Sequence, residues 1–396
     1  MQTRAHRNIK LLTWFNFCDD FRVYNAVAVI YFAQISHSYA LAGLVFSLAK
    51  VSAAVFEVPT GILSDLVQRR FTLVCGQVAS TLAVLCYAVA GSFDLLACGA
   101  AFEGLAFALF SGNNDALLYD TLREEGEQLQ FAVYQGRLGS MFQFALALSA
   151  LVATAALGWL PYVSLFWISL APKFLGLGLA LGLREPARSS LIDGNIYRHL
   201  RGAVAGFARD AKLRTLTLAS VIVSGLGESK FMLLPGFFAL FWPPWALGLA
   251  RLIGHLLAGT GFRLAGAVIG RFRESRVLLA AMPFSTLMGV SAIVASNVAS
   301  PALYSVSSLP YGPASVAQAS LLQKMFSERQ RATMASIGSL AGSLFFAVAI
   351  FALGALADRA GLPFALLTAE ILSIPTFVLY WRVFGKERQS VESEAS

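Results

Sequence analysis

Many ionisable side chains lie inside stretches that are otherwise apolar and long enough to cross a membrane. In mid-bilayer such a side chain costs about 2.5–3.5 kcal/mol on insertion scales, so it needs a partner, a ligand or a path for water. Its chemistry is then ion pairing, binding of an oppositely charged solute, or carriage of a proton. The bases are Arg22, Lys50, Arg137, Lys173, Lys230, Arg251, His255 and Arg263. The acids are Asp19, Asp20, Glu57, Glu103, Asp115, Glu228 and Glu370.

Spacing places some of these groups on shared helical faces. Asp19, Arg22 and Asn25 recur at intervals of three, which gives the first span a polar stripe. Arg251 and His255 are four apart and share a face in the same way. A histidine changes its charge near neutral pH, so His255 can titrate inside its span. For any single residue of the set, a structural ion pair is the alternative reading.

The composition is that of a membrane protein. The 396 residues are 57% hydrophobic and 13% charged, with a mean hydropathy of +0.67, whereas about 25% of the residues in soluble domains are charged. A net charge of +8 would fit a nucleic-acid-binding protein, but the basic residues gather in the loops on one side, which argues against that partner. The cysteines have no CxxC pair and no histidine at ligand spacing, so we expect no metal and no cofactor.

The elements that must position these residues are membrane helices. A helix of about 20 apolar residues crosses a bilayer, and the sequence has room for twelve. They are predicted at 11–35, 40–66, 71–91, 95–120, 131–155, 160–183, 213–240, 245–269, 277–297, 301–325, 332–357 and 362–384. We therefore predict an all-α polytopic membrane protein with twelve transmembrane helices in two six-helix pseudo-repeats. The predicted parts are an N-terminal bundle (1–183), a cytoplasmic linker (184–212) and a C-terminal bundle with a short tail (213–396).

The distribution of Lys and Arg predicts the orientation. Basic residues cluster at both ends of the chain, in the central connection and in alternate loops, while the opposite loops contribute only Arg359. Both termini and the central connection are therefore expected on the cytoplasmic side of the inner membrane. The central stretch with Arg198, His199, Arg201, Arg209, Lys212 and Arg214 is typical of a helix that lies on anionic lipid.

The sequence also repeats weakly. A shift of 208 residues lays Asp20-Phe21-Arg22 on Glu228-Ser229-Lys230, an acid and a base at the same place in both halves. A shift of 205 lays Gly61 on Gly266. Internal repeats are common in transporters, whose sites lie near the membrane midplane.

One short loop carries a recognisable motif. Residues 57–70 read EVPTGILSDLVQRR, in which Gly61, Asp65, Arg69 and Arg70 form a Gly-x-Leu-x-Asp-x-x-x-Arg-Arg pattern. This pattern resembles the cytoplasmic loop between helices 2 and 3 of the major facilitator superfamily. The family usually has a basic residue directly after the Asp and a Gly before the basic pair, where this chain has Leu66 and Gln68.

The resemblance implies a twelve-helix transporter whose halves rock around a central site. It implies that Asp65 caps a helix near Arg331, Ala332 and Thr333, that the loop arginines pair with Asp120, and that this cluster gates the conformational change. The stretch from Ser327 to Met334 is similar to the efflux branch of the family. Drug/proton antiporters of the family usually carry an Arg in helix 4 and a Gly-Pro pair in helix 5. Both are absent from residues 99–104 and from the fifth span.

These observations assign candidate roles. Lys50, Lys230 and Arg251 are expected to be the bases least compensated by acids, which favours a solute with a negative group. The predicted solute-binding residues are Arg22, Tyr24, Asn25, Lys50, Lys230, Arg251, His255, Tyr311 and Gln318. The predicted proton carriers are Asp19, Asp20, Glu103 and Glu228, and the predicted gate is Gly61, Asp65, Arg69, Arg70 and Asp120.

The resulting hypothesis is a monomeric secondary transporter, surrounded by lipid, that exports a small anionic, zwitterionic or amphiphilic solute with coupling to protons. Import of a metabolite or siderophore is the alternative. Two other classes are a membrane enzyme using Asp115, His255 or Glu103 and a transporter-like sensor, but the sequence has no catalytic motif and no soluble signalling domain.

Overall fold

The computed structural model describes residues 4–66, 68–186, 211–325 and 331–394, and these residues form helices without any strand. Internal contacts divide the chain into two compact units. Unit 1 comprises Met1–Leu191 together with Pro243–Leu252, and unit 2 comprises Ile192–Trp242 together with Ile253–Ser396. Of the residues predicted to form a helix on anionic lipid, Arg198, His199, Arg201 and Arg209 lie outside the described residues, and Lys212 and Arg214 lie at the start of the helix Ala211–Phe238. The predicted boundaries at 183 and 213 remain predictions.

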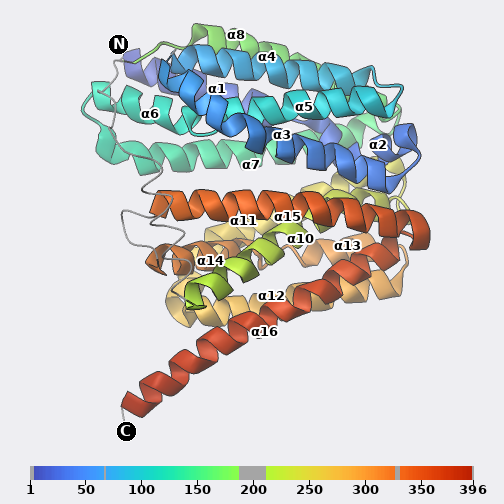
Figure 1. Ribbon diagram of the computed structural model, residues 1–396. Helices are drawn as coiled ribbons and strands as arrows, with labels where there is room; N and C mark the ends of the chain where they lie inside the picture. The colour runs from blue at the N-terminus through green and yellow to red at the C-terminus, as the bar shows by residue number, and fades with distance from the viewer. Residues whose placement is uncertain (1–3, 67, 187–210, 326–330, 395–396) are drawn as a thin grey trace. The chain divides into compact units, whose positions relative to one another are not determined.

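Unit 1 is a bundle in which helices distant in sequence run alongside one another (Figure 1). Its elements are α1 (Arg4–Asp20), η1 (Val23–Ala26), α2 (Ala28–Ser36), α3 (Tyr39–Leu66), α4 (Arg69–Ala88), α5 (Phe93–Phe110), α6 (Asn113–Glu124), η2 (Gln128–Gln130), α7 (Phe131–Ala156) and α8 (Val163–Gly182). Helices α3 and α5 approach closely at Gly104, which has no side chain to keep them apart. A Cβ at this position would collide with the carbonyl oxygen of Ala49.

Unit 2 has the same kind of construction. Its elements are α10 (Ala211–Phe238), α11 (Pro244–Phe272, whose first residues belong to unit 1), α12 (Glu274–Ala295), α13 (Ser300–Val306), α14 (Tyr311–Met325), α15 (Arg331–Ala360) and α16 (Leu362–Glu394). Helix α10 packs against α15 and α16, and α12 packs against α13, α14 and α16.

Ten helical stretches of the described chain are long and apolar enough to cross a membrane. They match ten of the predicted spans, of which 95–120 is interrupted at Ser111 and Gly112, and the other two, 11–35 and 301–325, are each divided. The first is interrupted between Asp20 and Ala28, where the backbone N–H of Val23 bonds to Ser169 Oγ at 3.0 Å. The second is interrupted between Val306 and Tyr311, where Pro310 has no N–H to continue the helix. The count of twelve spans in two repeats remains a prediction.

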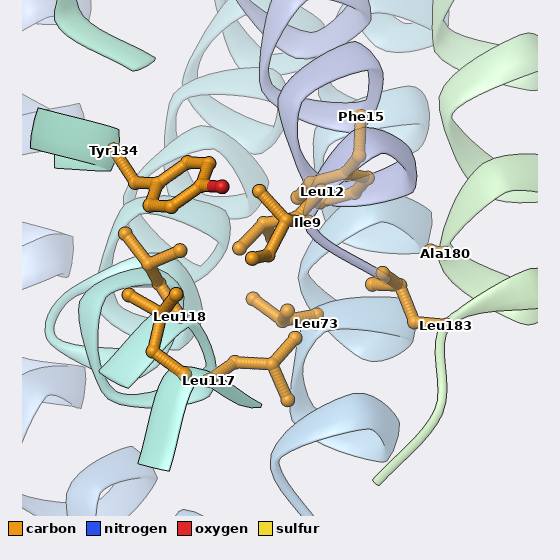
Figure 2. Packing of buried hydrophobic residues seen from close by; sticks show 10 residues of the cluster. Ile9, Leu12, Phe15, Leu73, Leu117, Leu118, Tyr134, Ala180 and Leu183 are labelled. Atoms are coloured by element: carbon orange, nitrogen blue, oxygen red, sulfur yellow. The ribbon is translucent and has the colours of Figure 1, made fainter. Parts of the chain in front are cut away.

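Each unit has an apolar core near one end of its helices. In unit 1, side chains of α1, α4, α6, α7 and α8 meet (Figure 2). The members are Ile9, Leu12, Phe15, Leu73, Leu117, Leu118, Leu122, Tyr134, Ala180 and Leu183. The corresponding cluster of unit 2 consists of Leu216, Ala219, Val277, Leu278, Ala317, Tyr380 and Phe384. These cores fix the helices on which the charged residues stand.

Large apolar side chains also cover the outside of the spans. Val348 is 70% exposed, Leu175 is 65% exposed and Leu287 is 60% exposed, and all three lie well inside membrane-length helices. A soluble protein rarely exposes apolar patches of this kind. The chain is therefore an integral membrane protein whose outer surface suits lipid.

Candidate functional site

Several buried charged side chains of unit 1 lie close together where α1 ends. Lys173 of α8 has no exposed surface, and its ammonium donates to the carboxylate Oδ1 of Asp19 and, at 2.7 Å, to the backbone oxygen of the same residue. It also donates to Ser80 Oγ of α4 at 2.7 Å, and that hydroxyl donates to Asp19 Oδ1 at 2.7 Å. The N-terminal and C-terminal spans of the bundle are thus joined by a buried ion pair.

Arg22 extends this pair into a network of four charges. Its Nη2 lies 2.9 Å from Asp19 Oδ2 and its Nη1 lies 3.1 Å from Glu103 Oε1 of α5. The guanidinium also stands over the ring of Phe107, 5.0 Å from its centroid. The other oxygen of Glu103 accepts a 2.8 Å hydrogen bond from the hydroxyl of Tyr87. The network holds two bases and two acids, so it is neutral as a whole.

Unit 2 contains a smaller cluster of the same kind. The ammonium of Lys230 on α10 lies 2.9 Å from Glu370 Oε2 on α16. Glu370 Oε1 accepts a hydrogen bond from the hydroxyl of Tyr304 on α13 at 2.8 Å. The side chain of Glu370 is 2% exposed, whereas that of Lys230 is 17% exposed. We call Lys230, Glu370 and Tyr304 the unit 2 triad.

The two clusters follow one plan. Arg22 and Lys230 coincide under the 208-residue shift, and each pairs with a glutamate that also accepts a tyrosine hydroxyl. The charges are reversed in one respect: the last span of unit 1 supplies a base, Lys173, and the last span of unit 2 supplies an acid, Glu370. This corrects the expectation that Lys230 is poorly compensated, because a full ion pair satisfies it.

Three predicted binding residues lie at the break after α1. Arg22 is engaged by two carboxylates. Tyr24 is 4% exposed and stacks on Phe166 with ring centroids 4.7 Å apart, so it forms part of an aromatic core and not of an open surface. Asn25 is exposed.

The other predicted binding residues lie on several helices. Lys50 on α3 and His255 on α11 are half-buried, and Arg251 on α11 is buried. Gln318 on α14 donates a 2.6 Å hydrogen bond to Ser220 Oγ. Tyr311, at the start of α14, is exposed, and its ring centroid lies 5.8 Å from that of Phe262.

The four predicted proton carriers differ in their surroundings. Asp19 and Glu103 are held in ion pairs. Glu228 is half-buried on α10. Asp20 is half-buried at the end of α1, and among the described residues no hydrogen bond or ion pair to its carboxylate is found. Asp20 can therefore gain or lose a proton without breaking a bond in the network.

The predicted gate is described only in part. Arg69 Nη1 lies 2.8 Å from Asp120 Oδ2, so the ion pair that the family resemblance implies is present. Gly61 is exposed on α3. The side chain of Asp65, and those of Arg331, Ala332 and Thr333 that it is expected to cap, lie outside the described part of the chain. Their roles remain predictions.

Glu185 joins this cluster without having been predicted. Its two carboxylate oxygens accept hydrogen bonds from the backbone N–H groups of Arg69 and Arg70, at 3.0 and 2.8 Å. Both donors belong to the first turn of α4, whose N–H groups have no partner within the helix. Arg70 Nη2 also donates to the backbone oxygen of Leu181 at 2.6 Å. A carboxylate at this place satisfies two donors and complements the helix dipole.

We expect Glu185→Ala to lower the stability of the protein by about 1–2 kcal/mol, because two charge-assisted hydrogen bonds at a helix N-terminus are lost. Thermal unfolding in detergent measures the change. The matched control is Glu125→Ala, which removes an exposed carboxylate at the end of α6. Equal melting temperatures for the two variants would contradict the capping role.

Comparisons with known proteins agree with this architecture. The sequence model of the Major Facilitator Superfamily matches residues 11–349. The nucleoside transporter NupG is 12% identical, with a TM-score of 0.82, and the match covers 96% of this chain and 99% of that one; a point mutant of NupG also matches with a TM-score of 0.82. A bacterial homologue of the human lysosomal transporter Spinster, in an inward-facing and unoccupied conformation, is 14% identical, with a TM-score of 0.77 and coverage of 97% for both chains.

At these identities the solved structures show a common fold and nothing finer. No curated protein matches the sequence. The family match spans most of the chain, from the first predicted span to the eleventh. The chain belongs to the Major Facilitator Superfamily.

Proposed function

We propose that the chain is a secondary active transporter that moves a small organic solute across the inner membrane by alternating access. The solute carries at least one negative group, and its movement is coupled to protons. The proposed direction is export, with both termini in the cytoplasm and one chain as the working unit. Family membership and the membrane-length helices support the class of protein.

The observation that carries the proposal is the position of Lys230. Its side chain stands in a membrane-spanning helix and remains 17% exposed beside a buried carboxylate. An ammonium cannot face lipid at mid-membrane without a cost of about 2.5–3.5 kcal/mol. Its exposed surface therefore calls for water or a polar solute, which a transport path supplies.

Proton coupling is assigned first to Asp20, with Glu228 at the equivalent place in the second half. Asp19 and Glu103 are less suited, since a proton on either would break an ion pair with Arg22. The Arg69–Asp120 pair, with Gly61, Asp65 and Arg70, is proposed to bias the inward-facing and outward-facing states without touching the solute.

Counterflow in liposomes tests the proposal. Vesicles loaded with an unlabelled solute should accumulate the labelled form transiently, since a carrier exchanges solute without net driving force. A panel of organic acids, amino acids, nucleosides and siderophores covers the proposed class and the import alternative. Exchange of any member supports a carrier, and an outward gradient that moves solute faster than an inward one supports export. A panel without exchange would favour a sensor or an enzyme.

A further inference from the structure

The unit 2 triad has a single base and a single acid. Within the described chain, Lys230 bonds to Glu370 and to no other titratable side chain. Glu370 bonds to Lys230 and Tyr304 and to no other titratable side chain. The network of unit 1 differs, because Arg22 touches both Asp19 and Glu103 and would keep one counter-ion if the other were lost. One proton on Glu370 therefore changes the triad completely, whereas one proton on Glu103 changes the unit 1 network only in part.

The surroundings of Glu370 are suited to holding its carboxyl group in either state. The side chain is buried between α10, α12 and α13, where Tyr304 fixes one oxygen. On α12 the facing residue is Gly289, and a Cβ there would lie 2.6 Å from Glu370 Oε1. The missing side chain thus makes room for the carboxyl group. Lys230, in contrast, has a side chain that is 17% exposed, and this is the surface that the proposed solute would approach.

We infer that the unit 2 triad is a proton-controlled anion site, in which a proton on Glu370 releases Lys230 to bind the carboxylate or similar negative group of the solute. This inference rests on the proposed transport function and adds Glu370 to the acids that take part in it.

The exchange balances in charge. Before it, the ammonium of Lys230 faces the carboxylate of Glu370. The site then takes up one proton, which stays on Glu370, and one anion, which replaces the carboxylate beside Lys230. No covalent bond other than the O–H bond is made or broken, and the site stays neutral throughout. A buried site exchanges one bound anion for another most readily when its net charge stays the same, because an unbalanced charge in a medium of low dielectric constant is costly.

The sign of the coupling follows. Proton and anion favour each other's binding, and by linkage each raises the affinity for the other by the same factor. They therefore cross the membrane in the same direction. In export, the solute and the proton would both move outward, driven by the concentration gradient of the solute. In import, both would move inward. A proton antiport of an anionic solute would need the two to compete, which the triad does not provide.

A binding experiment tests the site without transport and without knowledge of the natural solute. Benzoate serves as the probe and benzamide as its uncharged match, and thermal unfolding of the whole protein in detergent is followed at about pH 5.5 and about pH 8.5. Benzoate is ionised at both values, since simple carboxyl groups titrate near pH 4. The variants are Glu370→Gln, Lys230→Gln and, as a control, Glu57→Gln at an exposed position of α3.

We expect benzoate to raise the melting temperature of the wild type by about 3 °C at the lower pH and by less at the higher pH. In Glu370→Gln the rise should be the same at both values, because Lys230 is released permanently. Lys230→Gln should abolish it, Glu57→Gln should behave as the wild type, and benzamide should have no effect.

A benzoate effect that grows with pH, or one that survives in Lys230→Gln, would overturn the inference, and so would the absence of any effect in the wild type at the lower pH. Should Glu370→Gln fail to fold, the pH dependence of the wild type and the response of Lys230→Gln still decide. Failure of the counterflow experiment alone would count against transport and leave this site standing.

Discussion

Replacing Asp19 by Asn is expected to lower the stability of the protein by about 3–5 kcal/mol, because it leaves the ammonium of Lys173 buried without its counter-ion. Lys173 has no exposed surface. Its remaining bonds to Ser80 Oγ and to the backbone oxygen of residue 19 would satisfy two of its three N–H groups and leave its charge without a counter-ion. Thermal unfolding in detergent should show a melting temperature lower by roughly 10 °C.

Two further variants separate the loss of charge from other effects. Asp94→Asn removes an exposed carboxylate in the first turn of α5 and should cost about 0.5 kcal/mol. Adding Lys173→Met to Asp19→Asn removes the stranded charge and should restore part of the stability. If Asp19→Asn and Asp94→Asn had the same melting temperature, the buried network of unit 1 would not be what stabilises the bundle.

Replacing Lys230 by Gln should reduce the apparent affinity for an anionic solute on the order of 100-fold. A direct contact between unit charges at 4 Å is worth about 4 kcal/mol at an effective dielectric constant of 20, and about 1.4 kcal/mol corresponds to a tenfold change in affinity. The expected loss is smaller than the full Coulomb energy, because the ion pair with Glu370 competes for the same ammonium. Counterflow at graded solute concentrations measures it.

The control for this variant is Lys212→Gln, which removes an exposed charge at the beginning of the same helix. It should leave the affinity unchanged. An unaltered affinity in Lys230→Gln as well would remove this lysine from the solute site, and with it the observation on which the proposed function rests.

Local spacing and the internal repeat predicted part of the site. The interval of three between Asp19 and Arg22 corresponds to a real ion pair. The 208-residue shift singled out Arg22 and Lys230, which hold equivalent places in their clusters. The pairing of Arg69 with Asp120 came from the family resemblance and not from spacing.

The partners of the buried bases could not be predicted in this way. Lys173 and Asp19 are 154 residues apart, and Lys230 and Glu370 are 140 apart. Such contacts depend on how helices pack across a bundle, which the pattern of one sequence does not specify. For the same reason Lys230 was expected to lack a counter-ion, and Glu370 was not assigned to proton coupling.

The interruption of the first span was also beyond the sequence, whereas the interruptions of 301–325 and 95–120 have local signals in Pro310 and Gly112. Residues 11–35, 95–120 and 301–325 are apolar enough to predict continuous helices, yet α1 ends at Asp20, α5 ends at Phe110 and α13 ends at Val306. In the first case the hydroxyl of Ser169, on a helix far away in sequence, accepts the N–H of Val23. A tertiary contact that satisfies the backbone thus permits the break, and local propensity carries no sign of it.

Proton movement that accompanies solute movement is the decisive measurement for the proposed coupling of solute and proton. Liposomes containing the protein, an entrapped pH-sensitive dye and a solute identified by counterflow are diluted into solute-free buffer, with the membrane potential clamped. We expect the interior to become more alkaline as the solute leaves, since each anion departs with a proton, and we expect this change per solute molecule to be smaller in Glu370→Gln, which lacks one of the proposed proton carriers. Solute efflux from the wild type that leaves the interior pH constant, or that acidifies the interior, would contradict the coupled movement of anion and proton.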